Sequence, residues 1–136
     1  MAHNNRKEFI RALLLDIEAF DQMLQKDLFE NDIKRIGAEQ ELVIVDKRTL
    51  KAKSIAPEII AKKGNRDWLV PELSRYNLEI NLPPYKLDNT CFSDMELLLR
   101  KQINEVDDLL KDHGAWSILT GILPTMRKND LSNDHI

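Results

Sequence analysis

Two segments of this chain alternate apolar and polar side chains, and this alternation restricts its fold more than any other feature. The first, residues 36–46, reads Ile-Gly-Ala-Glu-Gln-Glu-Leu-Val-Ile-Val-Asp, and the second, residues 76–82, reads Tyr-Asn-Leu-Glu-Ile-Asn-Leu. Successive side chains of a β-strand point to opposite faces of the sheet. Each segment therefore predicts a strand with one apolar face, which a core must cover, and a second face that carries glutamates.

The alternation assigns each side chain of these strands to a face. In the first strand, one face carries Ile36, Ala38, Gln40, Leu42 and Ile44, and the other carries Glu39, Glu41, Val43 and Val45. In the second strand, Leu78, Ile80 and Leu82 lie opposite Asn77, Glu79 and Asn81. Glu39 and Glu41 therefore project from one sheet face, and Glu79 has a similar place in its own strand.

The pattern around these strands predicts helices. Residues 6–36 contain no Gly or Pro, and apolar residues three or four apart predict an amphipathic helix within residues 1–32: Phe9, Leu13, Ile17, Phe20, Leu24 and Leu28. Its polar face is not strongly basic, so we expect the helix to pack on the sheet rather than on a membrane surface. Pro57 and Gly64 are placed to begin and end a short helix over residues 58–63.

The second half of the chain predicts a longer helix. Ser93-Asp-Met-Glu96 has the form of a capping box, and the helix that it opens ends at about His113, before Gly114. A roughly helical apolar stripe along it comprises Leu97, Leu98, Lys101, Ile103, Val106, Leu109 and Leu110. The other predicted segments are a turn over residues 46–49, a return strand over 50–55, a strand over 115–123 and a polar tail over 125–136.

The order of these elements predicts an α+β fold, in which helices pack on one face of a mostly antiparallel sheet. A chain of 136 residues has the length of a single domain. We expect that domain to consist of an N-terminal helix (1–32), a sheet with two helices (33–124) and the polar tail (125–136).

Charge and cysteine content exclude several classes of protein. With 20 Lys and Arg against 23 Asp and Glu, the formal net charge of −3 provides no basic surface for bulk nucleic-acid binding. The apolar runs are far shorter than the ~20 residues of a membrane span, and the N-terminus lacks the apolar core of a signal peptide. We therefore expect a cytoplasmic protein without a membrane partner. The single cysteine, Cys91, permits no internal disulfide and is interpreted as a structural thiol.

The glutamates on the predicted sheet form a candidate metal site. Like charges on one sheet face repel, so Glu39 and Glu41 require a positive partner wherever their face is partly buried. Glu72 stands seven residues before Glu79 and would lie on the opposite face of a straight strand, unless a bend or bulge intervenes. Carboxylate oxygens suit Mg²⁺ or Mn²⁺ better than zinc. The alternative is that the same glutamates line a solvent-facing surface.

Three segments resemble motifs of one enzyme family. Residues 36–46 are similar to the first strand of glutamate–cysteine ligases and related carboxylate–amine ligases, with the pattern G-x-E-x-E-L-x-x-V-D. Residues 71–81 resemble the second acidic motif of that family, in which two acidic residues stand seven apart. Residues 115–124 are similar to a later strand that ends in a Gly-x-x-Pro-like turn. The three motifs occur in the family's order and together cover residues 33–128.

The resemblance implies a fold, a reaction and a set of ligands. The fold is that of glutamine synthetase and the guanidino kinases, a curved antiparallel sheet with helices behind it. The reaction uses ATP to convert the γ-carboxylate of glutamate to an acyl phosphate, which an amine such as that of cysteine attacks, as in glutathione biosynthesis. Matched position by position, Glu39, Glu41, Glu72 and Glu79 correspond to the acids that bind Mg²⁺. Family members are longer, so the chain corresponds to the N-terminal part of such an enzyme.

Two other functions fit the same residues. A non-catalytic module would bind a partner, or form homo-oligomers through an exposed sheet edge. A purely structural domain would have a solvated acidic face, and the combined substitutions Glu39→Gln and Glu41→Gln would then be neutral or stabilising. In the absence of a metal, we expect repulsion among the glutamates to raise their pKa values.

Overall fold

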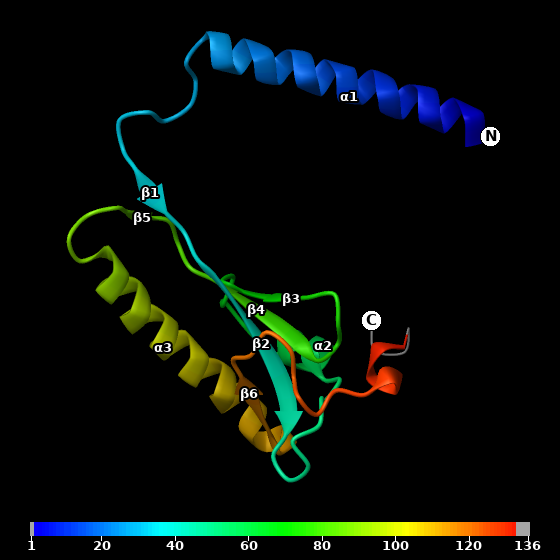
Figure 1. Cartoon of the computed structure of the whole chain (residues 1–136), viewed down its shortest axis with the longest axis vertical. Coiled ribbons are helices and arrows are strands. Elements are labelled where there is room, and N and C mark those ends of the chain that lie inside the picture. The colour runs from blue at the N-terminus through cyan, green and yellow to red at the C-terminus, as the bar shows by residue number, and fades with distance from the viewer. Residues whose placement is uncertain (1, 133–136) are drawn as a thin grey trace. The chain divides into compact units, whose positions relative to one another are not determined.

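A computed structural model describes residues 2–132 of the chain (Figure 1). Within this range the chain divides into two units, one that ends at Lys34 and one that begins at Arg35. The second unit contains the sheet and all four candidate glutamates. The last part of the predicted polar tail, residues 133–136, lies outside the described residues.

A four-stranded antiparallel sheet forms the centre of the second unit. Its strands, in spatial order, are β3 (Leu69–Pro71), β4 (Asn77–Asn81), β2 (Glu39–Asp46) and β6 (Ala115–Ile118). A smaller antiparallel pairing joins β1 (Arg35–Ile36) to β5 (Tyr85–Lys86). β4 pairs along its whole length with residues 39–43 of β2, because each alternating sequence turns its apolar face toward the same core.

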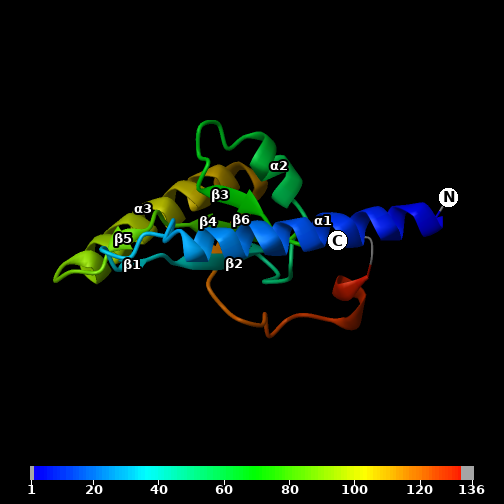
Figure 2. The same cartoon turned by 90° about the horizontal axis from the view of Figure 1, so that it is seen from above.

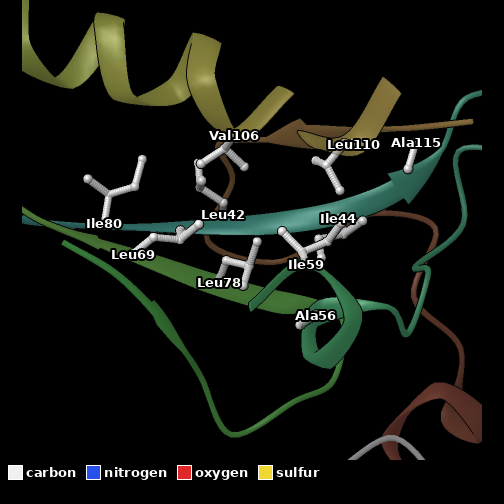
Figure 3. Close-up of a cluster of buried hydrophobic side chains, with 10 residues drawn as sticks. All are labelled: Leu42, Ile44, Ala56, Ile59, Leu69, Leu78, Ile80, Val106, Leu110 and Ala115. Carbon is white, nitrogen blue, oxygen red and sulfur yellow. The ribbon is translucent and has the colours of Figure 1, made fainter. Parts of the chain in front are cut away.

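The helices α2 (Ala56–Ala61) and α3 (Cys91–Leu110) lie on one face of the four-stranded sheet (Figure 2). Side chains from both helices and from the sheet fill the main core: Leu42, Ile44, Ala56, Ile59, Leu69, Leu78, Ile80, Val106, Leu110 and Ala115 (Figure 3). β2 and β4 contribute the residues that their alternation places on the apolar face. The predicted fold class, α+β with an antiparallel sheet and helices on one face, is confirmed.

Part of the other sheet face has a smaller core of its own. Val43 and Val45 are buried there together with Tyr76 and Leu123, and Met126 packs against them. The segment that follows β6 supplies the last two residues and runs along this face before the short 3₁₀ helix η2 (Lys128–Leu131) (Figure 2). The tail that the sequence predicts to be polar from residue 125 therefore contributes an apolar side chain to the fold.

The structure corrects two of the predicted strands. β6 ends at Ile118 rather than at Leu123, because the chain leaves the sheet and buries Leu123 over its face. Residues 50–55 form no strand, because Leu50 has a positive φ of 57° and the segment makes only an isolated bridge between Ala52 and Val45. A positive φ at a leucine is incompatible with extended pairing.

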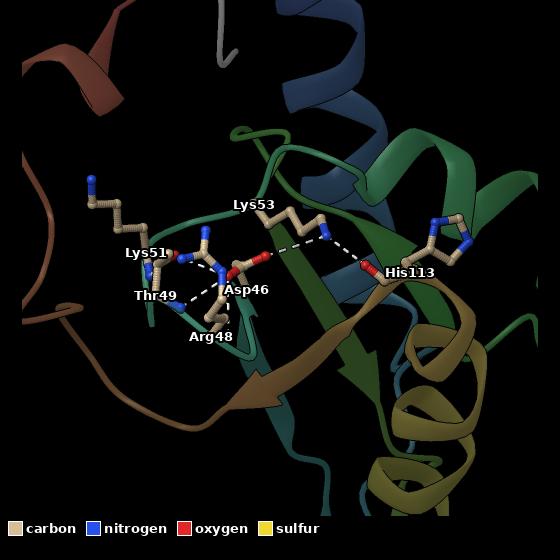
Figure 4. Close-up of polar contacts among 6 residues, drawn as sticks. All are labelled: Asp46, Arg48, Thr49, Lys51, Lys53 and His113. Carbon is tan, nitrogen blue, oxygen red and sulfur yellow. Dashed lines mark hydrogen bonds and ion pairs between the residues drawn. The ribbon is translucent and has the colours of Figure 1, made fainter.

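The turn after β2 is fixed by a single carboxylate (Figure 4). Asp46 Oδ1 accepts hydrogen bonds from the backbone N–H groups of Arg48 and Thr49, at 3.1 and 2.9 Å, and from the Thr49 hydroxyl at 3.0 Å. Lys53 Nζ lies 3.6 Å from Asp46 Oδ2 and also donates to the carbonyl of His113. The backbone hydrogen bond from Thr49 is the main cause that holds the pKa of Asp46 below its ordinary value. The predicted turn over residues 46–49 is confirmed.

The predicted limits of the helices also need correction. α2 begins at Ala56, and α3 begins at Cys91 with Thr90 as its N-cap, so Ser93 lies inside the helix and does not cap it. Two residues of the predicted stripe do not face the core, since Leu97 is 71% exposed and Lys101 is also exposed. The buried residues of α3 are Cys91, Met95, Gln102, Val106 and Leu110. Gly114, with a φ of 59°, ends the helical region after the 3₁₀ turn η1 (Lys111–His113), as predicted.

The first unit is built on the long helix α1 (Ala2–Gln25). The chain turns after this helix, at Asp27 with a φ of 50°, and the ring of Phe29 packs edge-on against Phe20 at a centroid distance of 5.6 Å. The helix therefore ends earlier than the predicted residue 32. The rest of this unit does not cover the apolar face of α1, since Phe9 is 65% and Leu24 is 55% exposed. Among the described residues, no helix is long and apolar enough to cross a membrane.

Candidate functional site

The pairing of β2 with β4 gathers three of the predicted glutamates. Glu41 lies directly opposite Glu79, and Glu39 lies opposite Asn81. Residues that face each other across an antiparallel pair have Cβ atoms about 4.5–5.5 Å apart, so the side chains of Glu41 and Glu79 are neighbours. This register places Glu39, Glu41 and Glu79 on the same sheet face, as the alternation predicts.

Glu72 joins this group from the end of β3. Val70 pairs with Glu79 and Pro71 pairs with Leu78, so the chain reverses direction between Glu72 and β4. The seven-residue separation of Glu72 and Glu79 therefore spans a hairpin, and the objection from the odd spacing on one straight strand does not apply. The influence of Glu72 on Glu79 is a rise in the pKa of that carboxyl, while Glu72 itself lines a separate hollow with Ala56, Pro57 and Arg75.

The neighbours of Glu79 shift the pKa of its carboxyl group. Asn81 Nδ2 donates a hydrogen bond of 2.9 Å to Glu79 Oε1, and this contact lowers the pKa of Glu79. Desolvation, the hydrogen bond with Glu72 and the negative charges of Glu39 and Glu72 act in the opposite direction. Their sum raises the pKa of Glu79 above its ordinary value. The group therefore favours the arrival of positive charge, whether a proton or a cation.

An open cleft lies beside these carboxylates. It has a volume of about 520 Å³ and is lined by Glu39, Gln40, Glu41, Glu79, Leu119, Thr120 and Gly121. The segment after β6 forms one wall of the cleft, because the chain leaves the sheet at Ile118. At Gly121, an added Cβ atom would meet no other atom within 4 Å. The cleft is therefore open at this wall.

Sequence reasoning missed three residues of this region. Asn81 holds Glu79 by a hydrogen bond, and its place two positions along the same strand face was the available signal. Thr120 and Gly121 line the cleft from a loop, whereas the sequence pattern assigns them to a strand over residues 115–123. The Gly-x-x-Pro ending of that segment is the signal for a loop, since both residue types interrupt strands.

The group offers the oxygen donors that Mg²⁺ and Mn²⁺ prefer, but no preformed cage. Within residues 2–132, no set of three or more His, Cys, Asp or Glu side chains is arranged to hold a metal ion. Asn77 Oδ1, on the same face of β4 as Glu79, is buried without a hydrogen-bond partner, but Asn77 pairs with Val43 in the covered part of the face and does not line the cleft. The donor set therefore fits a hard cation, and binding requires the glutamate side chains to converge.

Comparisons of the chain with protein-family models, with curated proteins and with solved structures found no match. A functional assignment therefore depends on the residues and contacts above and on the resemblance of the three motifs. The other reactive side chain that the sequence singles out, Cys91, is a buried free thiol at the start of α3. Its burial agrees with a structural role, because a buried cysteine packs as a small apolar residue.

Proposed function

We propose that this chain forms part of an ATP- and Mg²⁺-dependent carboxylate–amine ligase of the glutamate–cysteine ligase type. Such an enzyme joins the γ-carboxylate of glutamate to an amine such as that of cysteine through an acyl phosphate, in glutathione biosynthesis. The observation that carries the proposal is the gathering of Glu39, Glu41 and Glu79 onto one sheet face beside an open cleft, with Glu72 near enough to raise the pKa of Glu79. Substrates of this kind point to the cytoplasm as its place of action.

The architecture supports the same proposal. An antiparallel sheet with helices on one face and acidic side chains on the other is the arrangement expected of part of a glutamine synthetase-like catalytic fold. The three motifs of the resemblance occupy β2, the β3–β4 hairpin, and β6 with its following loop. These are the elements that supply the glutamates and the wall of the cleft.

Each glutamate has a distinct part in the proposed site. Glu39, Glu41 and Glu79 line the cleft and would supply carboxylate oxygens to Mg²⁺, and Glu72 would contribute through its contact with Glu79. Asn81 orients the Glu79 carboxylate by its hydrogen bond. When bound, Mg²⁺ neutralises the charge of a triphosphate and so supports phosphoryl transfer to a carboxylate. The excess negative charge around Glu79 makes cation binding favourable.

Binding of Mn²⁺, a spectroscopic substitute for Mg²⁺, tests the proposal. We would titrate the chain with Mn²⁺ with and without ATP, and compare wild type with the Glu39→Gln/Glu41→Gln variant by electron paramagnetic resonance. A matched control, Glu58→Gln/Glu96→Gln, removes the same charge from exposed helix positions. We expect saturable binding that the first variant loses and the control keeps, with unchanged circular dichroism. A folded wild-type chain without saturable binding would contradict the proposal.

A second candidate is a non-catalytic module that binds a partner or self-associates through a sheet edge. The observation that favours it is Trp116, which is 43% exposed on β6, the last strand in the spatial order of the sheet. An exposed edge with a large apolar side chain is a site for strand pairing between molecules. For such a module, Glu39→Gln/Glu41→Gln would leave partner binding intact, whereas Trp116→Lys would weaken it.

A further inference from the structure

The first unit carries an exposed apolar seam with coiled-coil spacing. Five side chains of α1 recur at alternating steps of three and four residues: Ile10, Leu13, Ile17, Phe20 and Leu24. Each is between 44% and 56% exposed. Apolar residues at this spacing form the contact line between paired helices, in which each side chain packs into a gap of the facing helix. The seam therefore has the form of one half of a helix pair.

The charges of α1 are divided between its two halves. Residues 5–13 contain Arg6, Lys7 and Arg11 against the single acid Glu8, whereas residues 14–25 contain three acids, at positions 16, 18 and 21, and no base. The first turn has no acid and the last turn has no base. This order opposes the helix dipole, which favours acids near the N-terminus and bases near the C-terminus. The division therefore does not stabilise an isolated helix, but it complements a helix that runs in the opposite direction.

We propose that α1 pairs with α1 of a second copy of this chain, antiparallel and related by a two-fold axis. The seam aligns when Ile10 of one copy lies against Phe20 of the other and Leu13 lies against Ile17. In this register the two copies of Leu14, which is 60% exposed, meet near the axis. The same patch serves both copies, so the assembly closes as a dimer.

The flanking charges select this direction. In the antiparallel register, Lys7 of each copy lies beside Asp21 of the other, so two opposite-charge pairs form. A hydrogen bond of 2.6 Å from Gln25 Nε2 to Asp21 Oδ2 holds that carboxylate on the helix surface. The same register brings the two copies of Asp16 together at the axis, so one like-charge pair stands against the two opposite-charge pairs. A parallel pair would instead place Asp16 of each helix beside Asp21 of the other, which gives two like-charge pairs, so the antiparallel direction is favoured. An anionic membrane is a poor alternative occupant, because the second half of α1 is acidic.

Sedimentation equilibrium of the full chain tests the pairing. We expect a concentration-dependent monomer–dimer equilibrium, and we expect Ile17→Asp to weaken it at least about a hundredfold because two buried side chains are lost per dimer. Leu15→Asp is the matched control, since Leu15 is as exposed as Ile17, at 56%, but lies off the seam. A monomer at every concentration, equal effects of both variants, or capture by anionic vesicles in place of dimerisation would overturn the proposal.

Charge reversal tests the direction. Lys7→Glu and Asp21→Lys should each weaken the dimer, and the double variant should recover most of the wild-type affinity. A parallel pair predicts the opposite result for Asp21→Lys, because this change removes the contact between Asp16 and Asp21; tighter association of that variant would refute the antiparallel register. Both experiments are made without divalent cations, so their outcome is independent of the proposed metal site.

Discussion

One face of β2 has two halves of opposite character. In the first half, Glu39 and Glu41 border an open cleft, and in the second half Val43 and Val45 are buried beneath Leu123. Both halves belong to one strand and one sheet face, so backbone geometry does not distinguish them. The segment after β6 covers the apolar half and only borders the acidic half. The covered half is stabilised by burial of its valines. The acidic half is open to the cleft, and its glutamates repel one another there.

A charge placed in the covered half gives the strongest test of this difference between the two halves. Val45 is fully buried, and Val45→Asp would leave an unpaired carboxylate in the small core. We expect a loss of about 3–5 kcal/mol in the free energy of unfolding, measured by urea denaturation. Glu39→Asp keeps a carboxylate in the open half, and its effect should stay within about 0.5 kcal/mol. Similar losses in the free energy of unfolding from both substitutions would contradict the difference between the covered and the open half.

The covering segment itself supplies the next test. Leu123 is 3% exposed, and we expect Leu123→Ala to cost about 2–3 kcal/mol because it removes apolar contact with the sheet and leaves a cavity. The neighbouring Ile122 is 82% exposed, so Ile122→Ala should have little effect. Urea denaturation of the two variants compares them directly. Equal costs would show that the segment does not cover the sheet as described.

Removing charge from the open half should have a smaller effect of opposite sign. Glu41 faces Glu79 directly, and like charges at such a position are destabilising by about 0.2–1 kcal/mol. Glu41→Gln should therefore increase the free energy of unfolding by about this amount at neutral pH, when no divalent cation is present. A decrease would indicate that Glu41 is already paired with a cationic group of the protein.

The pH dependence of stability distinguishes Glu79 from Asp46. The pKa of Glu79 is raised from 4.5, so its stabilising effect is present below that value and is lost as the pH rises through the folded-state pKa. The pKa of Asp46 is lowered from 3.8, so its contribution is present above that value and is lost as the pH falls through the folded-state pKa. Glu79→Gln should stabilise at neutral pH and become neutral in acid, whereas Asp46→Asn should destabilise at neutral pH. Denaturation curves across this pH range measure both.

The sequence was sufficient for features that depend on local alternation. β2 and β4 have strict alternation, so their core residues and the common face of Glu39, Glu41 and Glu79 could be predicted. The position of Glu72 relative to Glu79 could not be predicted, because it depends on a hairpin that the spacing alone does not reveal. The turn of the chain away from the sheet after Ile118 was also missed, because it is driven by burial of Leu123 against a distant strand.

The two long helices show a second limit. α1 and α3 both have an apolar stripe, and the sequence predicts burial for each. α3 buries Val106 and Leu110 against the sheet, whereas Phe9 and Ile17 of α1 are exposed. A helical period identifies a face that favours burial, but it does not identify the partner that buries it.

The central claim is that the acidic half of β2 and β4 binds a divalent cation, and the pKa of Glu79 tests it most directly. We would measure this pKa by ¹³C NMR of the side-chain carboxyl, with and without Mg²⁺, using Glu79→Gln to assign the signal. We predict a pKa above the ordinary value of 4.5 without Mg²⁺ and a clear decrease when Mg²⁺ is added. An ordinary pKa that Mg²⁺ does not change, in a folded protein, would contradict the account.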